Sequence, residues 1–330
     1  MKKIFFLVMT LMFMITLSGC GTSKEDDVVK SLTKKISSAE SYSITGTFEL
    51  INNEENYTYD INVNYKSAEK FKVSLVNKVN NHEQIILRNE SGVYVLTPSL
   101  NKSFKFQSDW PYNNSQTYIL QTLVKDIEND SEKDVKKLDD GYVITTSVNY
   151  SNKQDLVKQN IFLDKDINIT KIEVLNSENQ AKIVMNFNKI EFNSTINDDI
   201  FNIDNNVFSS EDNEKTVNTI DGIVFPMYVP TDTYLTSQDV ISVDGGERAI
   251  LTFSGEKPFT IIQETISNTD ILNMNVDGEP QMIMDTIGVL SDSYVSWISG
   301  GMEYYVISED LTQDELLTVA NSISVMPVSK

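Results

Sequence analysis

Apolar and polar residues alternate with a period of two along much of this chain. From Tyr42 to Leu50 every second residue is apolar or glycine, and the stretch from Tyr57 to Tyr65 repeats the pattern. A period of two places one face of a strand on a core and the other in water. Residues 52–55, between the two runs, predict a hairpin loop. Further strands are expected at 70–78, 83–89, 92–98, 103–107, 141–149, 157–163, 168–176 and 180–192.

Two stretches have helical spacing instead. After a capping box at 23–26, apolar residues recur every three or four positions from Val28 to Ala39. A second amphipathic helix is expected between 111 and 128, with Tyr118, Ile119, Leu123, Val124 and Ile127 on its apolar face. About ten strands with one helix in front and one inserted predict an open antiparallel barrel whose mouth the helices fill. Its concave face would suit a lipid or acyl chain.

The C-terminal third is predicted to form a second, smaller α+β domain over residues 220–330. The polar stretch 209–219 lacks periodicity and is interpreted as a linker. Residues 223–230 are apolar but contain two prolines, which favours an edge or extended segment. A hairpin turn at 244–246, strands at 248–254, 258–265, 282–290, 293–298 and 302–308, and a helix opened by a capping box at 312–315 complete the expected domain.

The N-terminus has the pattern of an export signal. Lys2 and Lys3 precede an apolar run from residue 4 to 17, which is shorter than the roughly 20 residues of a membrane span. Leu17-Ser18-Gly19-Cys20 then resembles a bacterial lipobox. The pattern predicts a signal peptide at 1–19, diacylglycerol on Cys20 and a lipid-anchored tether at 20–27, on the extracytoplasmic face of the cell membrane. A plain secretory signal and a single N-terminal span are the alternatives.

Composition narrows the partners. Cys20 is the only cysteine, so the mature chain has no internal disulfide and no thiolate metal site. Without Lys2 and Lys3, the mature chain has 25 basic against 48 acidic residues, a net charge of −23. Such a surface repels nucleic acid and anionic headgroups, so no nucleic-acid partner is expected. A basic partner stays open, although solubility is the plainer explanation of the charge.

Candidate catalytic chemistry is sparse. The single histidine, His82, falls in an Asn-rich stretch interpreted as an exposed loop. The neighbouring acids Asp139/Asp140 and Asp198/Asp199, and those at 25–27, lie in turns or at a helix start, and the carboxylates at 198–212 match no calcium-loop spacing. We therefore expect no catalytic residue, no metal site, and no cofactor beyond the diacylglycerol on Cys20. A hydrolase with paired acids is the weakest alternative.

The stretch from Gly92 to Pro111 is the most distinctive. It predicts a hairpin followed by an aromatic strand ending in Asp-Trp-Pro. Trp110 either lines a ligand cavity or plugs the core under the inserted helix, and the second reading is favoured. Trp110, Phe104, Phe106 and Tyr118 form the candidate ligand-binding set.

Taken together, these features resemble the YdcC-type sporulation lipoproteins. The resemblance rests on the lipobox, the first helix, the strand at 42–48, the residues 70–73, the stretch from Gly92 to Trp110 and the helix at 116–127. That group belongs to the LolA-like superfamily, as does the clostridial germination lipoprotein GerS. Residues 220–330 resemble a C-terminal domain of unknown function, through 255–264 and 297–305. GerS-like proteins are shorter, so the second domain favours the YdcC type.

The resemblance implies an α+β fold, with a LolA-like curved antiparallel half-barrel and helical lid at 28–208. It also implies a non-enzymatic module, anchored to the membrane of a Gram-positive spore former, that binds an envelope or spore protein during cell-envelope, sporulation or germination processes. The alternative is a carrier of a lipid or acylated ligand, although a fixed anchor prevents free shuttling. A large apolar pocket under the inserted helix would favour the carrier, and a filled concavity would favour protein binding.

Overall fold

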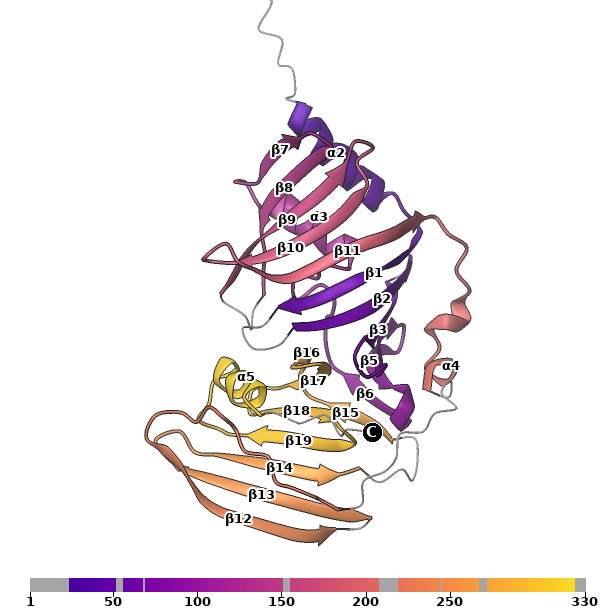
Figure 1. Ribbon diagram of the computed structural model, residues 1–330. Helices are drawn as coiled ribbons and strands as arrows, with labels where there is room; N and C mark the ends of the chain where they lie inside the picture. Colours follow the sequence, from indigo (N-terminus) through magenta and orange to yellow (C-terminus); the bar gives the residue numbers. More distant parts are fainter. Residues whose placement is uncertain are drawn as a thin grey trace, which may run out of the picture.

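The computed structural model describes residues 24–51, 56–67, 69–150, 155–207, 219–243, 245–266 and 272–323. The signal peptide, Cys20 and all but the last residue of the expected linker lie outside these ranges. The described chain consists mostly of two curved, unclosed sheets with a few helices (Figure 1). This arrangement confirms the predicted α+β half-barrel class.

The larger sheet forms the half-barrel. Its twelve strands follow the order β15-β6-β5-β4-β3-β2-β1-β11-β10-β9-β8-β7, and all neighbours are antiparallel except β15 and β6. The strands are β1 (Ser41–Ile51), β2 (Asn56–Lys66), β3 (Lys70–Asn77), β4 (Glu83–Asn89), β5 (Gly92–Thr97), β6 (Lys102–Phe106), β7 (Asp134–Leu138), β8 (Gly141–Ser147), β9 (Leu156–Asp164), β10 (Ile169–Asn176), β11 (Ala181–Phe192) and β15 (Leu272–Val276). A short helix, η2 (Pro98–Leu100), joins β5 to β6.

Two helices lie against the concave face of this sheet. They are α2 (Lys24–Ser37) and α3 (Leu120–Asn129), and their apolar faces join the core made by the strands. The described part of helix α2 includes residues 24–27, which the sequence assigned to the tether. Helix α3 has no side-chain cap of its own. Instead, the N–H of Leu120 donates to the Tyr42 hydroxyl (3.2 Å), which in turn donates to Gln121 Oε1 (2.7 Å).

The convex face of the half-barrel is covered over β4 and β5. A segment containing η3 (Asp198–Phe201) and α4 (Asp204–Val207) packs Ile196 and Phe201 against the outward side chains of these strands. Both faces of β4 and β5 are therefore buried, which explains why their sequences are continuous apolar runs and do not alternate.

The smaller sheet contains residues from the C-terminal third alone. Its order is β12-β13-β14-β19-β18-β17-β16. The strands are β12 (Thr233–Val243), β13 (Gly246–Gly255), β14 (Phe259–Thr265), β16 (Glu279–Ile283), β17 (Thr286–Leu290), β18 (Tyr294–Ser299) and β19 (Met302–Ile307). Helix α5 (Gln313–Asn321) and the extended segment 220–229 cover one face and enclose a separate core around Trp297 and Tyr304.

Three details differ from the sequence predictions. The single strand expected at 282–290 is a hairpin, because the chain turns at Met284 with a φ of 50°. Strands β7, β12 and β15 were not predicted. Strand β15 comes from the C-terminal third but pairs with β6, so the two expected domains share a sheet.

Candidate functional site

The concavity of the half-barrel is filled by a row of aromatic side chains. The ring centroids of Tyr42 and Tyr65 are 4.9 Å apart, those of Tyr65 and Phe71 are 5.0 Å apart, and those of Phe71 and Trp110 are 6.1 Å apart. The row runs across β1, β2 and β3 and ends on the loop after β6. Helices α2 and α3 pack over the same core.

Trp110 lies at the end of this row as a core residue, with 2% of its surface exposed. The Arg88 guanidinium donates a hydrogen bond to its carbonyl oxygen and forms an ion pair with Glu69 at 2.9 Å. The same guanidinium lies 5.6 Å from the centre of the Tyr112 ring. Arg88 therefore holds the Asp-Trp-Pro loop against β4.

The four candidate ligand-binding residues are all buried but do not form one site. Tyr118 packs edge-on against Phe48 at 5.6 Å and lines the same small cavity as Trp110. Phe104 lines a different cavity, next to β17 and β18. Phe106 belongs to the half-barrel core, where it is paired in register with Val93. Burial raises the pKa of the Tyr118 hydroxyl far above its ordinary value, so this group stays protonated.

The cavity beside Trp110 and Tyr118 has a volume of about 70 Å³. It lies between the mouth of the half-barrel and β16, where Pro280 and Met282 form part of its wall. Sites for drug-sized ligands are usually about 300–1,000 Å³. A space of this size holds a few water molecules at roughly 30 Å³ each, not an acyl chain.

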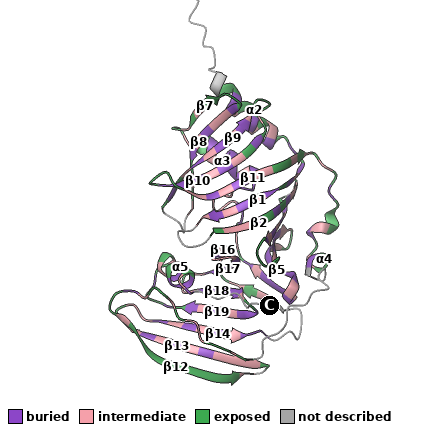
Figure 2. Cartoon of the chain, viewed as in Figure 1, coloured by how far each residue is buried: buried purple, intermediate pink, exposed green. Residues whose placement is uncertain are grey.

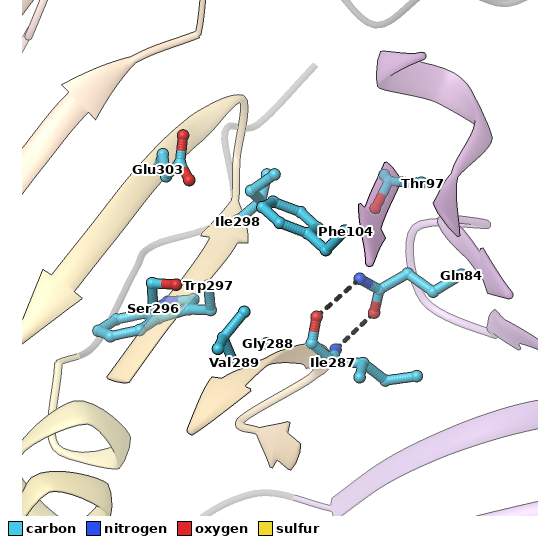
Figure 3. A pocket seen from close by; sticks show the side chains of 10 residues that line it. All are labelled: Gln84, Thr97, Phe104, Ile287, Gly288, Val289, Ser296, Trp297, Ile298 and Glu303. Atoms are coloured by element: carbon cyan, nitrogen blue, oxygen red, sulfur yellow. Dashed lines mark hydrogen bonds between the residues drawn. The ribbon is translucent and has the colours of Figure 1, made fainter. Parts of the chain in front are cut away.

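The C-terminal sheet closes the half-barrel through polar contacts. Gln84 of β4 exchanges two hydrogen bonds with the main chain of Ile287, at 3.1 and 2.5 Å (Figure 3). Lys102 of β6 forms an ion pair with Glu303 of β19 at 3.1 Å, and both side chains are nearly buried. Ile287, Val289 and Ile298 of the C-terminal sheet belong to the core of the half-barrel. The core of the half-barrel therefore extends onto the C-terminal sheet, which also has its own core around Trp297.

A third polar contact joins the C-terminal sheet to the loop that contains Trp110. The Glu279 carboxylate accepts hydrogen bonds from Ser108 and from Asn113 Nδ2, the latter at 2.7 Å. Burial raises the pKa of Glu279. These interface residues were missed from the sequence. The available signals were weak. Gln84 lies just before the apolar run 85–87, and Lys102 lies between the hairpin turn and an aromatic strand.

The described residues offer little catalytic geometry. Asp139, Asp140, Asp198 and Asp199 are exposed, and Asp198 forms an ion pair with Lys66 at 2.8 Å. His82 is half-buried in the turn between β3 and β4, not fully exposed as expected. No group of three or more His, Cys, Asp or Glu side chains in the described ranges is placed to hold a metal ion. The helices of these ranges include none with the length and apolarity needed to cross a membrane.

Comparison with known proteins identifies a full-length relative. No family model matches the chain. The sporulation protein YdcC of Bacillus subtilis (strain 168) is 35% identical over 328 residues, which cover 98% of this chain and 97% of that protein. The chain belongs to the YdcC family. The alignment extends over the residues of both sheets.

Solved structures show more distant similarity to this YdcC-family protein. A chain of the Pseudomonas aeruginosa MucA/MucB complex is 15% identical, with 92% of this chain and 99% of that chain covered and a TM-score of 0.32. A chain from the complex of the Clostridioides difficile CwlD amidase with the GerS lipoprotein is 20% identical, with 52% and 96% covered and a TM-score of 0.32. The LolA superfamily protein NE2245 of Nitrosomonas europaea is 12% identical, with 54% and 98% covered and a TM-score of 0.31.

Proposed function

We propose that this protein is a lipid-anchored, non-enzymatic lipoprotein that holds a protein partner at the envelope of a sporulating cell. The observation that carries the proposal is the filled concavity. Aromatic side chains and two helices occupy the half-barrel, and the cavity left beside Trp110 is about 70 Å³. A carrier needs room for its cargo, whereas a protein-binding module acts through its outer surface.

The sporulation setting follows from kinship. YdcC of Bacillus subtilis carries the name sporulation protein, and the two chains align over nearly their whole lengths. The non-enzymatic assignment is supported by the exposure of the acid pairs at 139–140 and 198–199 and by the position of the single histidine, His82, in a turn. The anchor is proposed from the lipobox sequence that ends at Cys20.

The anchor has a direct test. Growth with an alkyne analogue of palmitate should label the wild-type protein and leave a Cys20→Ala variant unlabelled. The wild type should fractionate with membranes, and the variant should not be retained there by lipid. Labelling of the Cys20→Ala variant would contradict the lipobox assignment.

Partner binding is tested by capture from sporulating cells. The tagged full-length protein is cross-linked in the cells and purified, and its protein and lipid contents are measured by mass spectrometry. We expect a protein that rebinds the purified lipoprotein at defined stoichiometry and whose deletion gives the same sporulation defect. Stoichiometric lipid on a Cys20→Ala variant would instead support the carrier. Recovery of neither a partner nor lipid would contradict both.

A further inference from the structure

Strand β12 is an exposed edge strand in the described part of the chain. It lies at the end of the smaller sheet and pairs, within the described part of the chain, only with β13. All residues between its two ends are exposed (Figure 2). A strand of 11 residues is about 37 Å long, and an edge strand presents unpaired N–H and C=O groups along its outer side.

Exposed apolar side chains concentrate on β12 and on the segment that precedes it. Of the eleven large apolar side chains found exposed in the described ranges, seven lie between residues 225 and 241. They are Phe225, Met227, Tyr228, Tyr234, Leu235, Val240 and Ile241. Leu235 and Val240 are paired in register with two buried residues, Phe253 and Ala249. The side chains of Leu235 and Val240 therefore lie on the same face of the sheet as the core, but they are exposed.

One edge strand of the larger sheet is built differently. Strand β7, at the end of the half-barrel sheet, has five residues, of which Asp134, Lys136 and Lys137 are charged. Short length and charged side chains are the usual protection of an edge against pairing with another chain. Strand β12 is more than twice as long and carries a single charge, Asp239. Short length and a high density of charge are therefore both missing from β12, whose pairing with β13 is interrupted by a single irregularity between Leu235 and Ser237.

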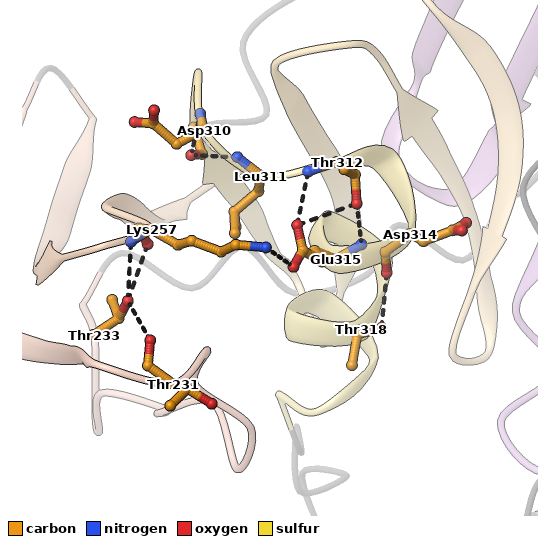
Figure 4. Close-up of polar contacts among 10 residues, drawn as sticks. Thr231, Thr233, Lys257, Asp310, Leu311, Thr312, Asp314, Glu315 and Thr318 are labelled. Atoms are coloured by element: carbon orange, nitrogen blue, oxygen red, sulfur yellow. Dashed lines mark hydrogen bonds and ion pairs between the residues drawn. The ribbon is translucent and has the colours of Figure 1, made fainter.

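The edge is held firmly in place. At its start, the Thr233 hydroxyl accepts a hydrogen bond from the N–H of Lys257 at 3.2 Å (Figure 4). The Lys257 ammonium is bound to Glu315, which also closes the capping box of α5 with Thr312. This network ties the β12 edge to the helix that covers the core of the sheet. A partner strand would therefore pair with an edge that is already ordered before binding.

The negative charge around β12 favours a partner segment that carries positive charge. Residues 219–266 contain seven carboxylates and two basic residues. Both basic side chains are already engaged, Arg248 with Glu264 and Lys257 with Glu315. Asp232, Asp239 and Glu256 are exposed along or beside the edge. A second copy of this chain, with a net charge of −21, would be repelled, whereas a basic segment would be attracted.

We propose that β12 docks an extended segment of a partner protein, apolar at alternate positions and basic at its ends, as an added antiparallel or parallel strand. Main-chain hydrogen bonds along the edge would supply affinity, and Leu235 and Val240 would contact the alternate apolar side chains. This inference rests on the proposed function, because it names the surface through which that partner is held.

The probe is a fluorescein-labelled peptide, Lys-Thr-Val-Thr-Val-Thr-Val-Thr-Lys, titrated into the purified Cys20→Ala protein. We expect saturable binding, and at least tenfold weaker binding when both lysines are glutamates or when the central valine is proline. A Leu235→Lys/Val240→Lys variant should lose at least tenfold in affinity. The matched Leu138→Lys/Val157→Lys variant changes charge equally at exposed apolar sites on the half-barrel and should bind like the parent.

Hydrogen–deuterium exchange locates the peptide. Protection confined to 233–243 would support the proposal, and protection elsewhere or no saturable binding would overturn it. A concentration-dependent dimer that is lost in the Leu235→Lys/Val240→Lys variant would assign the edge to a second copy and also overturn it. If the cellular partner still binds this variant, the surface is wrong and the proposed function stands. If the wild type captures no partner, the proposed function itself fails.

Discussion

The side-chain amide of Gln84 is paired with the main chain of Ile287 as if it were a residue of a neighbouring strand. Gln84 Nε2 donates to the Ile287 carbonyl, the Ile287 N–H donates back to Gln84 Oε1, and the Thr286 hydroxyl donates to the same oxygen at 2.9 Å. Gln84 is 5% exposed. A single side chain of the half-barrel thus satisfies the main chain of β17 at a residue that is paired with β16 but not with β18.

Replacing Gln84 with leucine should uncouple the two sheets. The change leaves buried main-chain groups of Ile287 without partners, at a cost of about 2–4 kcal/mol. The two tryptophans fall one in each sheet's core, Trp110 and Trp297, so fluorescence during urea unfolding follows both. We expect a lower midpoint and a broadened or split transition. Gln238→Leu, on the exposed edge, is the control, and equal behaviour of the two variants would disprove the coupling role.

The ion pair between Lys102 and Glu303 gives a second prediction at this interface. Their side chains are 7% and 12% exposed, and Glu303 also accepts a hydrogen bond from the Tyr305 hydroxyl at 2.7 Å. Lys102→Met leaves a buried carboxylate and should cost about 3–5 kcal/mol, most of which Lys102→Met/Glu303→Leu should recover. Chemical denaturation of the two variants measures the difference.

An exposed ion pair provides the comparison. Lys189 and Glu191 lie 2.8 Å apart with more than half of each side chain exposed, so Lys189→Met should change the unfolding free energy by less than about 1 kcal/mol. If the double variant at Lys102 and Glu303 is no more stable than Lys102→Met alone, the cost comes from lost packing and not from the uncompensated charge.

Local pattern was sufficient to predict most of the half-barrel. The alternation from Tyr42 to Leu50 and from Tyr57 to Tyr65 matches the buried and exposed faces of β1 and β2, because each of these strands has one face on the core. The two helices could also be predicted from the sequence, since the apolar face of each one packs on that same core. The four aromatic candidates are buried, and their role in ligand binding stays a prediction.

The remaining features depend on contacts that leave no local pattern. Strand β12 was missed because both of its faces are exposed, which removes the period of two. Strand β15 pairs with β6 across about 170 residues of chain, and no property of its own five residues specifies that partner. The hairpin at Met284 has a positive φ without a glycine to mark it. The polar interface was missed for the same reason, since Gln84 finds its partner only in the folded chain.

Close approach of two strands makes Gly46 a sensitive position. A Cβ atom there would lie 2.2 Å from the carbonyl oxygen of Asn186, at a register shift between β1 and β11. Gly46→Ala should therefore cost about 3 kcal/mol, seen as a fall in Tm of roughly 5–10 °C by calorimetry. Gly222 has no heavy atom within 4 Å of the same ideal position, so Gly222→Ala is the control. Equal Tm values for the two variants would show that the strands can separate freely here.

Asp126 should make stability depend on pH in an unusual direction. Burial on α3 raises its pKa to about 6, although hydrogen bonds from Ser115 and Gln159 act against the rise. Because the folded pKa lies above the ordinary value of 3.8, the folded state binds more protons between these values. The stability contributed by the protonated carboxyl is full below about pH 4 and is lost as the pH rises through 6.

Asp126→Asn removes this titration. Its unfolding free energy relative to wild type should rise between pH 4 and pH 7.5 by at most about 3 kcal/mol, as measured by urea denaturation at both values. Asp130, at the end of the same helix, gives the opposite sign. Partial burial of Asp130 acts to raise its pKa, but hydrogen bonds from the N–H groups of Ser147 and Glu132 hold the pKa below the ordinary value. The contribution of Asp130 to the unfolding free energy is therefore present at neutral pH and lost in acid. Asp130→Asn should therefore be less stable than wild type at pH 7.5 and approach it in acid. A pH-independent difference between Asp126→Asn and wild type would contradict the assignment of a raised pKa to Asp126.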